Sequence, residues 1–236
     1  MKTIVIGDIH GKDDWKKILR EHEWDKIVFL GDYFDSFTHS GKQQIDNFNE
    51  ILAVKRANPN DITLLIGNHD LHYVINESYS GFQKVYQFDI KELLLPLLKN
   101  KEIQVYTIID DYLLSHAGIT YTYLKNNDIK LEDLNEHFYI SPTILRFQPG
   151  DEYNVYGDEV CQSPVWVRPK SLLADYITDY KYIVGHTRQD QITKVGNVWF
   201  IDCLDSSKEY LLLENNIVKT VKILNKQTNE TNKQRN

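Results

Sequence analysis

The first part of the chain alternates between short apolar runs and segments in which apolar side chains recur at helical spacing. Three compact apolar runs are expected to form strands, and they are Thr3–Gly7, Lys26–Gly31 and Ile62–Ile66. Between the first two runs, Trp15, Ile18 and Leu19 follow a helical period within Lys12–His22. Strands that alternate with helices in this way are usually parallel, with the helices as crossover connections.

A second helix is predicted from Ser40 onward. Ser40-Gly41-Lys42-Gln43 fits a capping box, in which the hydroxyl and the Gln side chain satisfy free backbone amides at a helix start. The apolar side chains that follow at helical spacing are Ile45, Phe48, Ile51 and Leu52. The helix is expected to stop at Asn58-Pro59, because the residue before a proline disfavours the helical conformation.

The second half of the chain carries hairpin patterns. Pairs of apolar runs flank two-residue turn signals: Ile103–Ile109 and Tyr112–Ala117 around Asp110-Asp111, Gln191–Val195 and Val198–Asp202 around Gly196-Asn197, and Tyr210–Glu214 and Ile217–Ile223 around Asn215-Asn216. These turn residues tolerate or favour the positive φ of tight hairpins. The sequence therefore predicts an α/β fold of two packed mixed β-sheets flanked by helices, with parallel strands first and antiparallel hairpins later.

Length and composition favour one domain over residues 1–224. A chain of 236 residues with 42% apolar content can bury one substantial core. Residues 120–169 combine polar, aromatic, Gly and Pro positions, and we predict a lid or substrate-facing insertion there. Residues 225–236 contain no apolar side chain and are predicted to be a disordered tail.

Charge and cysteine content limit the classes of binding partner and the cellular location that we expect. The chain has 27 Lys and Arg against 34 Asp and Glu, a net charge of −7, which argues against an extended nucleic-acid surface or binding to anionic lipid. No charge-free apolar window approaches the ~20 residues of a membrane-spanning helix, and the apolar start is too short for a signal sequence. Two cysteines, Cys161 and Cys203, exclude a disulfide framework and a cysteine-rich zinc site. We predict a cytoplasmic protein.

Five short segments that each follow an apolar run offer side chains suited to metal ions. They are Gly7-Asp8-Ile9-His10-Gly11, Gly31-Asp32-Tyr33-Phe34-Asp35, Gly67-Asn68-His69-Asp70, His116-Ala117-Gly118 and Gly185-His186-Thr187. Each segment alone is compatible with an ordinary turn. Ligands of open α/β sheets bind beyond the carboxyl ends of the strands. The joint pattern therefore predicts that Asp, His and Asn side chains meet at one rim of the fold.

The series GDIHG, GDYFD, GNHD, HAG and GHT resembles the calcineurin-like metallophosphoesterase superfamily. Within it, the chain is similar to the branch that contains Ser/Thr protein phosphatases and bacterial diadenosine tetraphosphatases. The resemblance runs in order from Gly7 to Thr187 and implies a dinuclear metal centre. The implied ligands are Asp8, His10 and Asp32 for the first ion, and Asp32 as a bridge with Asn68, His116 and His186 for the second. The resemblance also implies a general acid, His69, with Asp35 as its orienting partner.

The chemistry of these side chains agrees with two divalent ions. Oxygen and imidazole ligands without thiolate suit Mn²⁺, Fe, Zn²⁺ and Ni²⁺. Of these metals, we predict Mn²⁺. Two such ions bring four positive charges and the carboxylates of Asp8 and Asp32 return two, so the inner shell attracts a phosphate dianion. Ions ~3.5–4 Å apart can share a water, and the bridging hydroxide would attack phosphorus directly.

An arginine is expected to hold the phosphate, because the guanidinium fork matches phosphate oxygens. Arg168 is the favoured candidate, Arg188 the second choice and Arg146 a weaker one. Ser36-Phe37 and Ile66 stand where Ser/Thr phosphatases of this branch carry arginines, so two expected phosphate-binding arginines are missing. The segment around His69 is closer to the diadenosine tetraphosphatase pattern, whereas the final GHT followed by Arg188 is more phosphatase-like.

The predicted function is a metal-dependent phosphoesterase that hydrolyses phosphomonoesters, with Ser/Thr phosphoproteins as the first choice of substrate. The alternatives are a dinucleoside tetraphosphate hydrolase, a phosphodiesterase acting on RNA or cyclic nucleotides, and a catalytically silent metal-binding scaffold. The expected partner is thus a phosphorylated protein or nucleotide. His72 lies three residues past His69, and two roles are open for it. It either orients a residue of the site or has a purely structural role.

Overall fold

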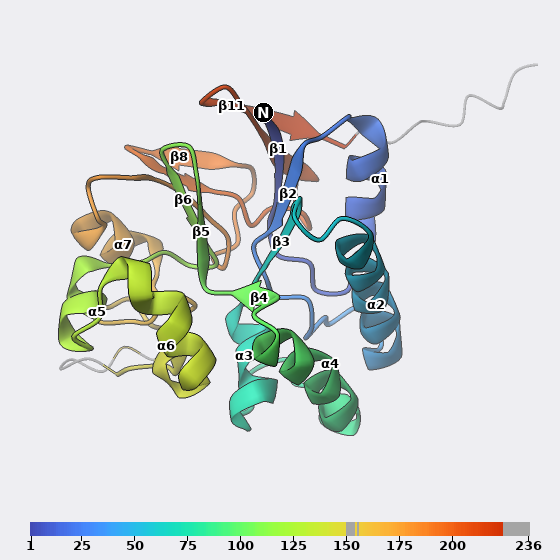
Figure 1. Ribbon diagram of the computed structural model, residues 1–236, viewed down its shortest axis with the longest axis horizontal. Helices are drawn as coiled ribbons and strands as arrows, with labels where there is room; N and C mark the ends of the chain where they lie inside the picture. Colours follow the sequence, from blue (N-terminus) through green and yellow to red (C-terminus); the bar gives the residue numbers. More distant parts are fainter. Residues whose placement is uncertain (150–153, 155, 224–236) are drawn as a thin grey trace, which may run out of the picture.

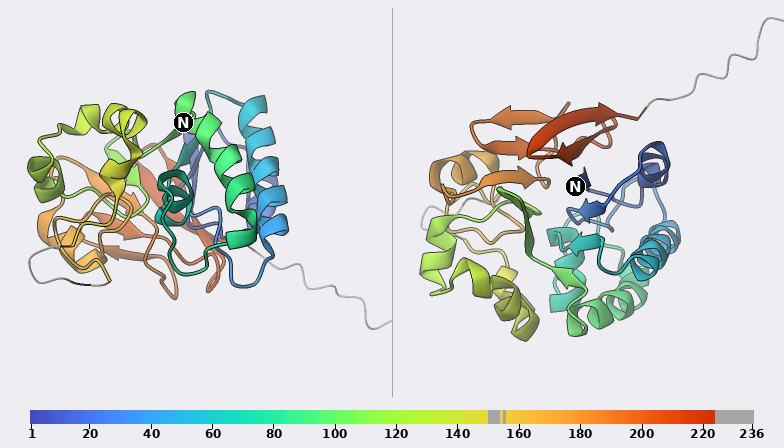
Figure 2. Two further views of the ribbon diagram at one scale, coloured as in Figure 1. Left: turned by 90° about the horizontal axis from the view of Figure 1, so that it is seen from below. Right: turned by 45° about the horizontal axis from the view of Figure 1, so that its top comes forward.

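Two β-sheets with helices outside them make up the protein in the computed structural model, which describes residues 1–149, 154 and 156–223 (Figure 1). Helices of the first half of the chain lie on one side of the molecule, and those between residues 121 and 175 lie on the other (Figure 2). This arrangement confirms the predicted α/β fold of two mixed sheets flanked by helices. The predicted tail, residues 225–236, lies outside the described residues.

The first sheet contains the strands predicted early in the chain together with the last hairpin. Its order is β11 (Ile217–Lys222), β10 (Glu209–Glu214), β1 (Lys2–Ile6), β2 (Lys26–Phe29), β3 (Ile62–Leu65) and β4 (Ile103–Gln104). Strands β1 to β4 are parallel, and β10 pairs antiparallel with both of its neighbours. Side chains alternate between the two faces of β1: Val5 points to the apolar cluster shared by both sheets, whereas Ile4 and Ile6 belong to the larger cluster.

The second sheet has the order β5 (Tyr106–Ile109), β6 (Tyr112–Ser115), β7 (Lys181–Val184), β9 (Val198–Phe200) and β8 (Thr193–Val195). Strands β6, β7 and β9 are parallel, and the pairs β5–β6 and β8–β9 are antiparallel hairpins. The carboxyl ends of β6 and β7 therefore point in one direction, and the segments that follow these two strands begin at the same edge of the sheet.

The strand predicted over Ile103–Ile109 is wrong as a single element. The chain leaves the first sheet after β4 and enters the second as β5, and the two are separated by Val105 (Figure 1). Asn135 stabilises this change of sheet, because its Oδ1 accepts from the backbone N–H of Val105 at 2.8 Å and its Nδ2 donates to the carbonyl of Tyr106 at 3.2 Å. The sequence pattern does not reveal such a switch, because buried apolar side chains lie on both sides of it, Ile103 before and Tyr106 after.

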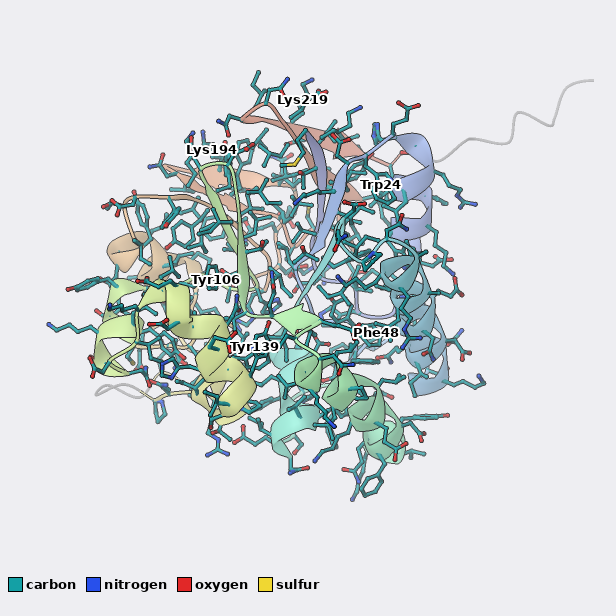
Figure 3. The ribbon with its side chains drawn as sticks, viewed as in Figure 1. Trp24, Phe48, Tyr106, Tyr139, Lys194 and Lys219 are labelled. Carbon is teal, nitrogen blue, oxygen red and sulfur yellow. The ribbon has the colours of Figure 1, made fainter. Side chains whose placement is uncertain are left out.

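Four helices of the first half are α1 (Asp14–Glu21), α2 (Gly41–Ala57), α3 (Asn68–Ile75) and α4 (Gln87–Lys99), with a 3₁₀ turn η1 (Lys84–Tyr86) before α4. The capping box predicted at Ser40 and Gln43 is present, and α2 ends at Ala57, before Asn58. Phe48, labelled in Figure 3, is fully buried and packs on Tyr33. Helix α1 begins two positions later than predicted, after Asp13.

Residues 120–149 form short helices over the second half of the fold. They are α5 (Tyr121–Asn126), η2 (Leu131–Asp133), α6 (Leu134–Ile140) and η3 (Pro142–Leu145), and α7 (Pro169–Asp175) follows. Tyr123, Phe138 and Leu145 are buried in the larger apolar cluster. The role of 120–169 as a lid and the single domain over 1–224 stay predictions. Among the described residues, no helix combines the length and apolar character needed to cross a bilayer.

Candidate metal centre

The six predicted metal ligands meet at one end of the two sheets. They follow the carboxyl ends of five strands, which are parallel to their neighbours in this set within each sheet: Asp8 and His10 follow β1, Asp32 follows β2, Asn68 opens α3 after β3, His116 follows β6, and His186 follows β7. Two clusters of possible ligand atoms form there, Asp8 with His10 and Asp32, and Asp32 with His116 and His186. Both clusters contain Asp32, the residue expected to bridge.

Asp32 lies between two imidazoles. Its Oδ2 is 3.6 Å from Nε2 of His10 and 3.4 Å from Nε2 of His116. In each ring the other nitrogen faces a backbone carbonyl: Nδ1 of His10 is 2.6 Å from the oxygen of Phe34, and Nδ1 of His116 is 2.9 Å from that of Leu30. A carbonyl can only accept, so both Nδ1 atoms carry the proton. The Nε2 electron pairs are therefore directed toward Asp32, as metal-ligating histidines require.

Asn68 has a similar position between two imidazoles. Its Oδ1 lies 3.1 Å from Nε2 of His116 and 3.0 Å from Nδ1 of His186. Nε2 of His186 donates to the carbonyl of Trp166 at 3.2 Å, which leaves Nδ1 of His186 without the proton. In the neutral rings, unshared electron pairs of oxygen and nitrogen then face one another across about 3 Å. A cation among them would turn this repulsion into attraction.

The protonation of the histidines favours the same conclusion. Burial lowers the pKa of His10 and His116, and it lowers the pKa of His186 well below its usual value. Neutral imidazole is the form that binds metal ions. The three rings are thus prepared as ligands without the loss of a proton.

The carboxylates of the site repel one another. Burial, followed by the charges of Asp202 and Asp32, raises the pKa of Asp8 well above its usual value. Burial and then Asp32 raise the pKa of Asp202 to about 6. Burial alone would raise the pKa of Asp32 too, but the surrounding imidazoles, led by His116, lower it below its ordinary range. Divalent cations would relieve this repulsion. Because the donor set also contains only oxygen and nitrogen, these residues fit divalent ions.

The loops that carry the ligands have unusual backbone geometry. His10, Asp32 and His186 have positive φ angles of 42°, 51° and 64°. Left-handed conformations of this kind cost about 1–3 kcal/mol for residues other than glycine and gather at functional sites. The fold therefore holds these three side chains in orientations that relaxed turns would not provide.

Two glycines allow the carboxylates to approach the backbone. A Cβ atom at Gly67 would lie 2.1 Å from Oδ1 of Asp32, and one at Gly185 would lie 2.2 Å from Oδ1 of Asp8. No side chain can occupy these positions without displacing a proposed ligand. The glycine that opens each of these two motifs thus has a steric cause.

Asp70 ties the loops after β2 and β3 together, a role that the sequence did not reveal. Its buried carboxylate accepts from the backbone N–H groups of Asp32, Tyr33 and Gly67 at 2.8, 2.8 and 2.9 Å. Asp202, at the end of the apolar run Val198–Asp202, lines the pocket, and its place in the sequence does not indicate a role there either. The signal that the sequence offered for both residues is an acid within a motif or at the end of an apolar run. Acids at such positions are also common in ordinary turns.

His69 and Asp35 form the predicted pair. Nδ1 of His69 lies 2.8 Å from Oδ2 of Asp35, and the backbone N–H of His69 donates to Oδ1 of Asp32 at 2.9 Å. Burial opposes the charge on His69, but Asp32 and Asp35 outweigh it and raise the pKa of the imidazole to about 9. Burial likewise raises the pKa of Asp35, but contacts from His69, His72 and Tyr73 leave it below its usual value.

These side chains surround an open pocket of about 260 Å³. Its lining comprises Asp8, His10, Asp32, Asn68, His69, Tyr79, Ser80, Trp166, Arg168, His186 and Asp202. Arg168 lies on its wall, where Nε donates to the carbonyl of Tyr156 at 2.7 Å and one terminal nitrogen donates to Oγ1 of Thr187 at 3.1 Å. Arg188 is absent from this lining of described residues, and Arg146 is paired with Glu77 instead.

The sequence model of the family described as calcineurin-like phosphoesterase matches residues 1–224. The chain belongs to this family. Members of the calcineurin-like phosphoesterases use divalent metals, and the sequence-based prediction of the family is confirmed.

Relatives of this calcineurin-like phosphoesterase include a protein of Encephalitozoon cuniculi named "Probable serine/threonine-protein phosphatase". It is 25% identical over 190 residues, which are 73% of this chain but 35% of that protein. The chain thus spans about a third of the length of that relative.

Two solved structures share the fold. A cold-active protein-tyrosine phosphatase of a Shewanella species has a TM-score of 0.63 and 19% identity, covering 93% of this chain and 77% of that one. A serine/threonine phosphatase of Saccharomyces cerevisiae has a TM-score of 0.62 and 16% identity, covering 97% of this chain and 82% of that one. Both are similar in architecture, which confirms the fold class predicted from the pattern of apolar runs and hairpin turns.

Proposed function

We propose that this protein is a dinuclear metal-dependent phosphomonoesterase, and that its substrates are proteins phosphorylated on serine or threonine. The observation that carries the proposal is the pair of buried ligand clusters that share Asp32. The name of the Encephalitozoon relative supports the choice of substrate. A cytoplasmic location stays a prediction.

The residues that would hold the two ions divide into two sets. Asp8 and His10 with Asp32 would hold the first, and Asp32 with Asn68, His116 and His186 would hold the second. We propose Mn²⁺ for both positions, with Fe, Zn²⁺ and Ni²⁺ as alternatives that accept the same donors. When bound, the ions would supply positive charge for the phosphate and an acidified water for attack on phosphorus.

His69 would provide the proton that the leaving oxygen needs. Because Nδ1 is engaged by Asp35 at 2.8 Å, Nε2 is the nitrogen left for the leaving group. His69 lines the pocket and its side chain is 19% exposed, so it is accessible to a substrate. General acids of this kind contribute about 10²–10⁴-fold to a rate.

Arg168 would bind the phosphate, and the size of the pocket favours a monoester. A volume of about 260 Å³ suits a phosphoryl group and the beginning of a side chain, whereas sites for larger organic ligands measure roughly 300–1,000 Å³. Ser36 and Ile66 stand at the positions of the two missing arginines, and because neither side chain carries a positive charge, neither replaces the guanidinium. One guanidinium on the described lining is a poor match to the four phosphates of a dinucleoside tetraphosphate.

The test compares four substrates side by side with the Mn²⁺-loaded protein: a phosphoserine or phosphothreonine peptide, p-nitrophenyl phosphate, bis-p-nitrophenyl phosphate and diadenosine tetraphosphate. The proposal expects hydrolysis of the two monoesters. Hydrolysis of the dinucleotide alone would favour the tetraphosphatase alternative, and hydrolysis of the diester alone would favour a phosphodiesterase. Full metal loading without hydrolysis of any of them would leave a silent scaffold.

A further inference from the structure

Asp35 receives contacts from three side chains of helix α3, not only from the proposed acid. Nδ1 of His69 lies 2.8 Å from its Oδ2, and Nε2 of His72 lies 2.7 Å from the same oxygen. The hydroxyl of Tyr73 donates to the other oxygen, Oδ1. These three residues occupy positions i, i+3 and i+4, which place them on one face of a helix. The Asp35 side chain that they contact is completely buried, with an exposure of 0%.

The proton of His72 is on the nitrogen that faces Asp35. Its Nδ1 accepts from the backbone N–H of Tyr79 at 3.2 Å, so that nitrogen has no proton and Nε2 carries it. The N–H direction departs from a straight hydrogen bond, and the 2.7 Å contact with Asp35 is therefore chiefly electrostatic. The imidazole is completely buried and stacks on the ring of Tyr79 at 5.4 Å.

The hydroxyl of Tyr73 is fixed in the same manner. It accepts from the backbone N–H of Gln83 at 2.8 Å, so its own hydrogen is directed to Asp35. Phe82 holds the two rings from the outside, stacking on Tyr73 at 4.8 Å and meeting His72 edge-on at 5.1 Å. Neither His72 nor Tyr73 is among the described residues that line the metal pocket, so neither can touch a substrate there.

We propose that His72 and Tyr73 are positioning residues that act on the reaction through Asp35. The hydrogen bond from Tyr73 and the electrostatic contact with the Nε2–H of His72 hold the carboxylate in one orientation. The carboxylate in turn holds the His69 ring with Nε2 directed to the leaving group. The inference rests on the proposed function, in which His69 is the general acid. It also resolves the two readings of His72 in favour of support for the site.

The experiment removes each donor while retaining ring volume. Tyr73→Phe deletes the hydroxyl, His72→Phe deletes the Nε2 donor, and His72→Gln restores an N–H donor at a similar reach. Phe82→Leu is the matched control, because it loosens the packing on both rings without removing a donor. All variants are assayed in the Mn²⁺-loaded protein with a phosphoserine peptide, whose alkoxide leaves poorly, and with p-nitrophenyl phosphate, whose phenolate leaves without help.

The expected result is a selective loss in kcat. Tyr73→Phe and His72→Phe should each lower kcat on the peptide by about 10-fold, a fraction of the 10²–10⁴-fold of general acid catalysis, with KM unchanged and p-nitrophenyl phosphate hydrolysis nearly unaffected. His72→Gln should regain most of the loss, and Phe82→Leu should affect both substrates alike. Equal losses on both substrates for the donor variants, or no loss, would overturn the inference.

A second measurement does not depend on turnover. In proton NMR of the metal-free protein, the Nδ1–H signal of His69 should be visible in the wild type because Asp35 accepts it, and Tyr73→Phe and His72→Phe should broaden or abolish it. An unchanged signal in both variants would overturn the inference. His69→Gln separates a failure of the proposed function from a failure of the positioning role. If His69→Gln lowers kcat equally on the peptide and on p-nitrophenyl phosphate, the acid role of His69 fails. If His69→Gln lowers kcat selectively on the peptide but the His72 and Tyr73 variants do not, only the positioning role is rejected.

Discussion

The backbone N–H of His186 donates to both carboxylate oxygens of Asp8, at 3.0 and 3.1 Å, across 178 positions of the sequence. Asp8 follows a strand of the first sheet and His186 follows a strand of the second. This contact joins the two sheets at the rim where the ligand clusters lie. The proposed centre is therefore shared between the sheets, and its integrity depends on how they pack.

Asp32→Asn should remove both metal ions and the activity together. Asp32 belongs to both ligand clusters, so one substitution weakens both positions. Activity should fall by more than about 100-fold, since even residues that only support a metal ligand contribute 10–100-fold. Metal content after gel filtration and phosphatase assays measure the two effects. Asp46→Asn, at an exposed ion pair with Lys42, is the control, and an Asp32→Asn protein that retained two ions would contradict the bridging role.

Arg168→Lys should weaken phosphate binding more than Arg188→Lys does. The Arg168 guanidinium lies on the pocket wall, and a lysine cannot reproduce its fork. Losing one charge-assisted hydrogen bond of about 1.5–3 kcal/mol should lower kcat/KM by about 10–100-fold. Steady-state kinetics of both variants on one phosphopeptide decide between the two arginines, and a larger loss for Arg188→Lys would transfer the phosphate-binding role to that residue.

Gly67→Ala should damage the centre, because the added Cβ would lie 2.1 Å from Oδ1 of Asp32. Overpacking of this kind typically costs about 1–3 kcal/mol, and here the displaced atom belongs to a proposed ligand. Gly196→Ala is the matched control: its Cβ meets nothing within 4 Å, although φ is +56°. We expect both variants to lose stability on urea unfolding but only Gly67→Ala to lose metal. Normal metal content in Gly67→Ala would show that the loop adapts.

Chelation should lower the thermal stability of the metal-loaded protein. Each ion that binds only the folded state stabilises it by about 2.7 kcal/mol at 100 times its Kd. For a chain of this size that corresponds to about 5–10 °C in Tm for each ion. Differential scanning fluorimetry with and without EDTA measures the shift. The Asp32→Asn protein should show no shift, and an unchanged wild-type Tm would argue against tightly held ions.

Ser40→Ala should reduce stability and leave catalysis alone. The Ser40 side chain caps α2 within a complete capping box. Ser40 is not among the described residues that line the metal pocket. Loss of such a cap costs about 1 kcal/mol, or about 2–4 °C in Tm for a protein of this length. Thermal unfolding and kcat on p-nitrophenyl phosphate test both halves of the statement, and a fall in kcat would reveal a link between α2 and the site.

The sequence predicted the elements whose signals are local. The capping box at Ser40 and the hairpin turn at Gly196-Asn197 are both present, since few neighbouring residues determine them. The meeting of the ligand segments followed from the rule that parallel strands end at one rim. The sheet change at Val105 could not be predicted, because it depends on Asn135, thirty positions away.

The contacts that Asp70 and His72 make could not be predicted for the same reason. Asp70 acts by accepting backbone N–H groups from a loop 37 and 38 positions earlier, and His72 contacts an aspartate of that loop. Nothing in a single sequence distinguishes such a buried acid or histidine from a solvated one. The resemblance to a family implied the ligand set together with His69 and Asp35, but it implied no role for Asp70.

The positive φ angles of His10, Asp32 and His186 also restrict how the chemistry of this rim can change. Among residues other than glycine, asparagine, aspartate and histidine are several-fold enriched in the left-handed region. Exchange of an oxygen or imidazole donor for a thiolate would thus meet resistance from the main chain before any ion was bound. The geometry of three peptide units therefore favours aspartate and histidine, the donors that stand at these positions.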